Sequence, residues 1–164
     1  MAQVHYYLGE FERARDLRLA ALAAVDTGAP EIHEMWGNLA DAYRQLDERE
    51  AALEAYLRAE EILERDRLRG TATLADRAAR AFYYTAIAEL APARMTVALA
   101  REVDAELEAL REEELEPTAG VRLALAWMGR GDFAAARSAI ERATKRCPVY
   151  ARQPGLEALS LAAH

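Results

Sequence analysis

Few side chains in this 164-residue sequence are of the types that perform acid–base, nucleophilic or metal chemistry. The histidines are His5, His33 and His164, and the one cysteine is Cys147. The run His-Glu-Met-Trp from His33 begins like a zinc-protease motif, in which two histidines four residues apart share one helix face. The residue four positions after His33 is glycine, so the second ligand is missing and a zinc site is not expected.

Nucleophile and phosphate-binding motifs are also absent from the sequence. Cys147 follows Lys145 and Arg146, whose charges favour a thiolate, but no histidine stands beside it in sequence. Neither G-x-x-x-x-G-K-[ST] nor G-x-G-x-x-G occurs, and Gly129-Arg130-Gly131 fits a turn between helices. The sequence therefore predicts no catalytic residue, no cofactor and no metal ligand, and a protein that is not an enzyme.

Composition excludes several further classes of protein. A net charge of -7 disfavours a nucleic-acid partner, because phosphates require clustered Lys and Arg. A single cysteine excludes a disulfide scaffold. The N-terminal sequence MAQVHYYLGEFERARD lacks the basic start and apolar run of a signal peptide, and no later stretch is apolar enough to span a membrane. We therefore expect a soluble, cytoplasmic protein with no membrane contact.

The elements that carry these residues are predicted to be helices. Alanine is the most frequent residue, joined by Leu, Glu and Arg, and these types lose least on entering a helix. Apolar residues recur at helical spacing between sparse Gly and Pro breakers, and Asp132 after Gly131 is a candidate N-cap. The expected helices span about 31–46, 48–66, 74–91, 93–114, 118–129, 132–146 and 155–163. An extended turn is expected from about Asp66 to Asp76.

An internal repeat is the strongest pattern in the sequence. Alanines recur four times with successive spacings of 12 and 7 residues. The triplets are Ala2, Ala14, Ala21 (copy one); Ala40, Ala52, Ala59 (copy two); Ala86, Ala98, Ala105 (copy three); and Ala124, Ala136, Ala143 (copy four). Copies one and four also share Gly-Glu-Phe and Gly-Asp-Phe before the middle alanine. Small residues at this spacing indicate helix pairs whose backbones approach closely.

Larger residues at matching offsets point to a known family. Copy two supplies Trp36, Leu39, Ala40, Tyr43, Ala52, Tyr56 and Ala59. With a later proline at Pro148, this set resembles the tetratricopeptide repeat (TPR). The resemblance is strong in copies two and four and weaker in one and three. Arg18 and Glu102 stand where copy two has Tyr56, so looser packing is expected there.

The resemblance implies an all-α fold, a right-handed α-solenoid of antiparallel helix pairs. It would contain about three complete repeats, a truncated first repeat and a C-terminal capping helix. The chain would form a single domain over residues 1–164. Its expected repeats are 1–29, 31–70, 74–115 and 117–150, with the cap at 154–164.

In the family, the first helices of the pairs line a concave face that binds proteins or peptides. Carried onto this sequence, that face gives the expected partner-binding residues Tyr6, Asp41, Arg44, Arg80, Tyr83 and Ile87. Solvated or locally paired side chains are the alternative for Arg44 and Arg80. We expect a non-enzymatic scaffold that binds a protein or peptide, as the interaction or sensing domain of a larger bacterial regulator. The alternative is a structural self-association module that forms a homodimer.

Overall fold

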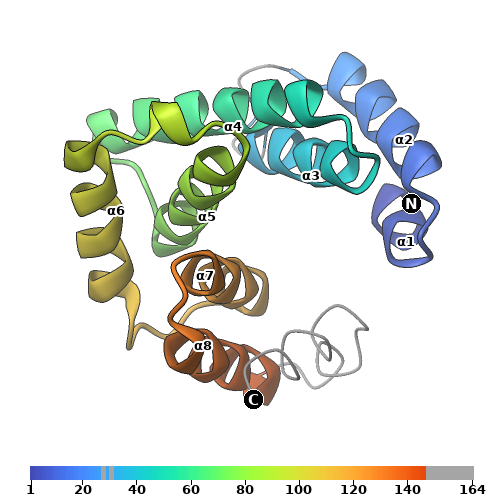
Figure 1. Ribbon diagram of the computed structural model, residues 1–164. Coiled ribbons are helices and arrows are strands. Elements are labelled where there is room, and N and C mark those ends of the chain that lie inside the picture. Colours follow the sequence, from blue (N-terminus) through green and yellow to red (C-terminus); the bar gives the residue numbers. More distant parts are fainter. Residues whose placement is uncertain (27–28, 30–31, 147–164) are drawn as a thin grey trace. The chain divides into compact units, whose positions relative to one another are not determined.

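The computed structural model describes residues 1–26, 29 and 32–146, and every regular element among them is helical. The helices are α1 (Ala2–Tyr7), α2 (Phe11–Ala24), α3 (Ile32–Gln45), α4 (Arg49–Arg69), α5 (Leu74–Leu90), the 3-10 helix η1 (Pro92–Arg94), α6 (Val97–Leu110), α7 (Pro117–Gly129) and α8 (Phe133–Arg146) (Figure 1). The predicted all-α fold is confirmed for these residues. The expected cap at 154–164 and the proline at 148 lie outside them.

The chain forms two compact units, Met1–Leu68 and a second unit that starts at Arg69. In the first unit α1 packs on α2 and α2 on α3. In the second, α5 packs on α6, α6 on α7 and α7 on α8. Helices that pack consecutively in this way are consistent with a TPR-like helical solenoid. The expected single domain and the repeat boundaries stay predictions.

Three of the turns inside helix pairs share one geometry. Gly9, Asp47 and Gly131 have positive φ angles of 78°, 57° and 78°, and each stands five residues before the middle alanine of its copy. At each turn this residue's N–H donates to the carbonyl three residues back, and the next N–H donates to the carbonyl five residues back, at 2.9–3.1 Å. This pair of hydrogen bonds is the Schellman motif, which ends a helix at a residue in the left-handed conformation. In these three copies the turn therefore lies at the same distance before the middle alanine. We call this shared numbering relative to the alanines the register.

Copy three departs from this turn. Its equivalent residue, Ala93, lies in η1 beside Pro92, where neither residue type favours a left-handed conformation. The next helix, α6, starts only at Val97, with the Thr96 hydroxyl oxygen accepting the Leu99 N–H at 3.2 Å. It ends at Leu110, because the Glu run that follows would place negative charge at the negative end of the helix dipole. The expected helix 93–114 is thus shorter at both ends.

The connection between α4 and α5 is also shorter than expected. Helix α4 continues through Asp66 to Arg69 and stops at Gly70, whose φ is 71°. Helix α5 begins with a capping box, in which the Asp76 N–H donates to the Thr73 hydroxyl at 3.1 Å and the Thr73 N–H donates to the Asp76 carboxylate at 2.8 Å. Only residues 70–73 therefore lie outside the two helices. The capping box satisfies backbone N–H groups at the start of α5, which would otherwise have to bind water.

The alanine triplets are buried unequally. All three alanines are buried in copies two and four, whereas copy one buries only Ala14 and copy three only Ala86. In copy four the approach is so close that a Cβ added to Gly120 would stand 2.9 Å from the Ala143 Cβ. In copy three, α5 packs more extensively on α7 than on α6. Helix α6 buries the larger side chains Val103, Leu107 and Leu110 instead. The predicted difference in strength between the copies is therefore visible in their packing.

An arginine ties the α6–α7 segment to the α7–α8 turn. Arg111 donates to Glu108 at 2.7 and 2.9 Å and to Asp132 at 3.0 Å, and its guanidinium carbon lies 4.3 Å from the centre of the Trp127 ring. Asp132 accepts the Ala135 N–H at 2.9 Å, so it caps α8 as predicted. This backbone hydrogen bond and Arg111 hold the pKa of the Asp132 carboxyl below its usual value.

Candidate partner-binding site

Three of the six predicted partner-binding residues come together in the first unit. Tyr6 lies on α1, and Asp41 and Arg44 lie one turn apart on α3. Tyr6 is hydrogen-bonded to the Gln45 side chain and interacts electrostatically with both Asp41 and Arg44. Burial, and after it the charge of Asp41, raises the pKa of Tyr6 to about 12. Three residues that the family resemblance placed on one face therefore lie close together. With their neighbours we call them the polar cluster: Gln3, Tyr6, Arg18, Asp41, Arg44 and Gln45.

A buried tyrosine holds Asp41 in place. Tyr56 on α4 is fully buried, and its hydroxyl donates to Asp41 Oδ1 at 2.5 Å. Burial, then the nearby Asp41 charge, raises the pKa of Tyr56 well above its ordinary value. The phenol therefore stays protonated and acts as a fixed donor. The orientation of Asp41 is consequently set from inside the helix pair.

Arg18 belongs to the polar cluster although the sequence reasoning did not include it. Its side chain on α2 is inside the fold, with the residue only 6% exposed. One guanidinium nitrogen donates to the Gln3 side-chain oxygen at 2.9 Å, and the guanidinium carbon lies 4.8 Å from the Tyr6 ring centre. Burial lowers the pKa of the Arg18 guanidinium. Where copy two places the Tyr56 ring, copy one thus buries a guanidinium that stacks on the Tyr6 ring.

The position of Arg18 in its copy could have indicated from sequence alone that it belongs to the polar cluster. Gln3 and Asp41 both follow the first alanine of their copies directly, and Arg18 and Tyr56 both stand four residues after the middle alanine. In each copy these two positions are joined by a side-chain hydrogen bond, Arg18 to Gln3 and Tyr56 to Asp41. The same inward position therefore carries the same kind of link with different residues.

The other three predicted residues lie on α5 in the second unit. Arg80, Tyr83 and Ile87 are all buried, Tyr83 being only 1% exposed. Arg80 donates to the Glu102 carboxylate and to the Tyr84 hydroxyl, each at 3.1 Å. It also lies 4.8 Å from the centre of the Tyr84 ring. Arg80 thus links α5 to α6, and contact of the three side chains with a partner stays a prediction.

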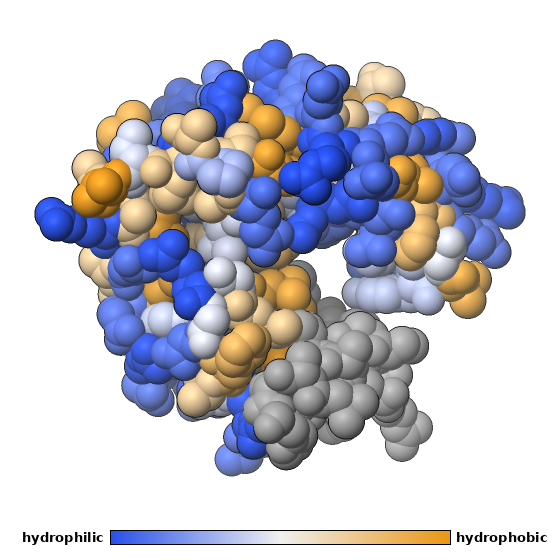
Figure 2. Space-filling model, viewed as in Figure 1, coloured by the Kyte–Doolittle hydropathy of each residue, from blue (hydrophilic) through white to orange (hydrophobic). Residues whose placement is uncertain are grey.

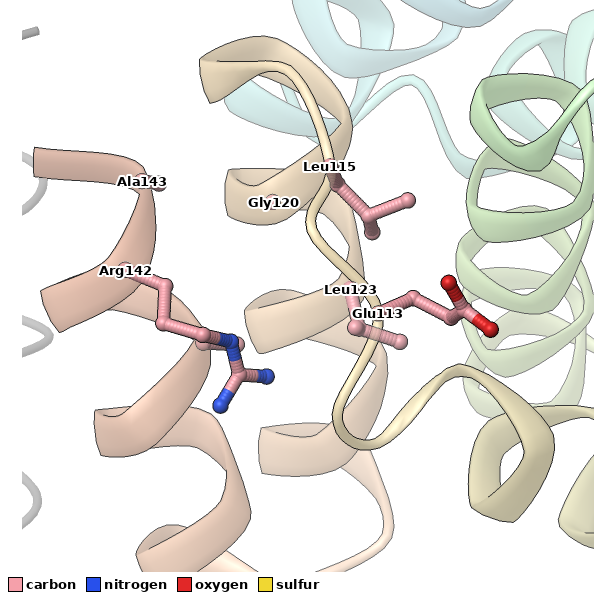
Figure 3. Close-up of a pocket in the computed structure, with 7 residues that line it drawn as sticks. Glu113, Leu115, Gly120, Leu123, Arg142 and Ala143 are labelled. Carbon is pink, nitrogen blue, oxygen red and sulfur yellow. The ribbon is translucent and has the colours of Figure 1, made fainter. Parts of the chain in front are cut away.

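A small cleft opens between α7 and α8 (Figure 3). Gly120 and Leu123 on one helix and Ala139 and Ala143 on the other form its apolar wall. Two charged side chains, Glu113 and Arg142, also line it, and Arg142 reaches from α8 toward the segment before α7. The Arg142 guanidinium donates to the Ser138 hydroxyl at 2.7 Å and to the Arg111 carbonyl. Arg142 therefore connects the segment before α7 to α8. The cleft is a gap in the packing of these elements.

The described residues contain neither a metal-binding cluster nor a membrane-spanning helix. No group of three or more His, Cys, Asp or Glu side chains there is placed to hold a metal ion. Within the same part of the chain, no helix combines the length and the apolar character that crossing a membrane requires.

Comparison with known proteins supports the repeat assignment. The family model described as tetratricopeptide repeat matches residues 33–62, which cover α3 and most of α4. The TPR resemblance read from copy two is thereby confirmed, and the chain contains a tetratricopeptide repeat. No curated protein matches the sequence.

Proposed function

We propose, on the premise that residues 33–62 form a tetratricopeptide repeat, that this chain is a non-enzymatic module that binds a protein or peptide through the polar cluster of its first unit. TPR repeats generally mediate protein–protein interaction. The observation that carries the proposal is the convergence of Tyr6, Asp41 and Arg44 around α1 and α3.

The polar cluster is organised before any partner arrives. Asp41 is fixed by the buried Tyr56, and the Tyr6 ring is backed by the Arg18 guanidinium. Arg44 and Gln45 remain exposed at the end of α3. A rigid aromatic contact beside exposed polar groups binds with little loss of side-chain entropy. The cluster thus favours a partner that supplies hydrogen-bond acceptors and an acidic group for Arg44.

The two tyrosines of this region are poorly suited to act as a base or a nucleophile. A tyrosine acts as a base or nucleophile only when it is ionised near neutral pH. The pKa values of Tyr6 and Tyr56 are raised by burial and by Asp41, so both phenols stay protonated there. This supports a binding role over an enzymatic one.

Several further roles are proposed from the sequence alone. A place in a larger bacterial regulator rests on repeats longer than the minimal unit and on 20 Arg against one Lys. A cytoplasmic location and the absence of a nucleic-acid partner rest on composition. Arg80, Tyr83 and Ile87 remain proposed contacts, and protection of residues 80–87 from amide exchange on partner binding would support them.

The test is a selection followed by measured affinities. A displayed peptide library is selected against the whole chain, and isolated binders are titrated calorimetrically into the wild type and two variants. Arg44→Glu reverses a charge in the polar cluster, whereas Arg65→Glu reverses an exposed charge on α4 outside it. We expect Arg44→Glu to weaken binding at least about tenfold, which corresponds to about 1.4 kcal/mol, and Arg65→Glu to leave it unchanged. Binders weakened equally by both variants, or by neither, would refute the proposed site.

A further inference from the structure

Helix α6 is attached to its neighbours differently from the second helices of copies two and four. Helices α4 and α8 bury the second and third alanines of their copies, whereas Ala98 and Ala105 on α6 are both exposed. The buried side chains of α6 are Val103, Leu107 and Leu110. Hydrophilic residues are prominent over the region of α6, at the left of Figure 2. A narrow stripe of apolar contacts therefore holds this helix.

Ion pairs supply the rest of the attachment. Three carboxylates of α6 pair with arginines of other elements: Glu102 with Arg80 at 3.1 Å, Glu106 with Arg77, and Asp104 with Arg130. Arg77 and Arg80 lie on α5, and Arg130 directly follows α7. The three carboxylate side chains are 25–52% exposed, so dissolved ions reach them. Because salt screens exposed ion pairs, the attachment of α6 depends on ionic strength.

The main contacts of the second unit do not involve α6. Helix α5 packs more extensively on α7 than on α6, and α7 packs most extensively on α8. A connection at residues 91–96, which includes η1, separates α6 from α5. At the other end of α6, Arg111 is fixed by Asp132 and by the Trp127 ring. Helix α6 is thus bounded by a connection and by an anchored residue, and its departure would leave the contacts among α5, α7 and α8 in place.

We propose that α6 is an electrostatic strap, which detaches from α5 as one element and pivots at Arg111 while α5, α7 and α8 stay packed. Each partly exposed ion pair contributes little alone, but all three act on the same opening equilibrium, so their losses add. The strap opens when dissolved ions compete with its carboxylates for the three arginines.

Opening of the strap changes what α5 presents to a partner. In the closed state Arg80 is 7% exposed and is occupied by Glu102. Detachment of α6 frees Arg77 and Arg80 together, so the carboxylates of α6 act as an internal stand-in for an acidic partner. The proposed contact of Arg80 with a partner then requires the open state. The strap belongs to the second unit and the polar cluster to the first, so either proposal stands or falls alone.

The test is amide hydrogen exchange of the whole chain, resolved by mass spectrometry of peptic peptides, in a series from about 0.05 M to about 1 M NaCl. At the higher concentration the screening length is about 3 Å. We expect the amides of α6 to exchange faster than those of α7 and α8. They should also speed up at least about tenfold across the series, which corresponds to about 1.4 kcal/mol. The amides of α7 and α8 should not speed up, because added salt does not weaken apolar packing.

A double variant separates the ion pairs from general destabilisation. Glu102→Gln with Glu106→Gln removes the two carboxylates that reach α5. It should speed exchange of α6 at low salt at least about fivefold and reduce the salt effect to about threefold or less. A merely destabilising change would raise the rate and leave the salt effect intact. The matched control is Glu50→Gln with Glu54→Gln, an equal change of charge at exposed positions on α4, which should leave exchange of α6 unchanged.

Three results would overturn the proposal. The first is exchange of α6 that is as slow as that of α7 and α8, or that salt does not accelerate. The second is equal acceleration of α6 and α8 by salt, and the third is an equal effect of the two double variants on α6. The salt series uses the wild type alone, so it decides the question even if a variant fails to fold.

Discussion

A close contact between α5 and α7 allows a sharp test of the packing. Gly129 is the last residue of α7, and a Cβ placed on it would stand deep inside the van der Waals radius of the Thr85 Cγ2 methyl group. Thr85 is buried, and its hydroxyl donates to the Ala81 carbonyl at 3.0 Å, which fixes the rotamer. The side chain therefore cannot rotate away without losing that hydrogen bond, so Gly129→Ala must shift the helices.

The size of the effect follows from these contacts. Overpacking of a well-packed interior costs about 1–3 kcal/mol. Replacing glycine with alanine in a helix returns up to about 1 kcal/mol, and less at a helix end such as this one. We therefore expect Gly129→Ala to lower the free energy of unfolding by about 1–2 kcal/mol. Thr85→Ser removes only the offending methyl group and should cost about 1 kcal/mol in the wild type.

The assay is a double-mutant cycle measured by urea unfolding. Trp127 is buried on α7 two residues before Gly129, so its fluorescence reports on this contact once Trp36 is replaced with Phe in every variant. Thr85→Ser should be stabilising in the Gly129→Ala background, giving a coupling of about 1–2 kcal/mol.

Gly120→Ala provides the matched control for this cycle. A Cβ on Gly120 would meet Ala143, 2.9 Å away, and not Thr85. Gly120→Ala should therefore destabilise the protein without being rescued by Thr85→Ser. If the two substitutions at Gly129 and Thr85 are additive, or if Thr85→Ser rescues Gly120→Ala as well, the α5–α7 contact is not as described.

Two further predictions concern the turns and the buried phenols. Asp47→Gly should raise the free energy of unfolding by about 0.5–1 kcal/mol, because glycine adopts the left-handed conformation without a Cβ clash. Gly131→Ala should lower the same free energy by about 1 kcal/mol. Chemical denaturation measures both changes, and changes of the same sign would contradict the turn assignment. Since the pKa of Tyr6 is raised to about 12 in the folded chain against about 10 when unfolded, its contribution is complete below pH 10 and is lost as pH rises toward 12. Tyr6→Phe and Tyr56→Phe should each flatten this alkaline loss of stability, followed by circular dichroism, and an unchanged pH profile in both would show that the two phenols titrate normally.

Much of the fold could be predicted from the sequence because its signals are local. Helix ends depend on residues within a few positions of each other, as at Gly70, Thr73 and Asp132. The alanine triplets of copies two and four, where the family resemblance is strong, are the ones that are fully buried. The face implied by the family resemblance contained Tyr6, Asp41 and Arg44, which lie close together.

The rest depended on which distant helices meet. Alanines with identical spacing are buried in copy four and mostly exposed in copy three, because α5 turns its main contact to α7 and α6 packs through larger side chains. Arg18 is an ordinary charged residue in the sequence, and its burial depends on Tyr6 and Gln3 arriving from another helix. Propensity and capping are set by neighbours along the chain, so the sequence by itself determined the helices and turns. Burial is set by contacts between elements far apart in sequence, so only the tertiary structure decided which alanines are core.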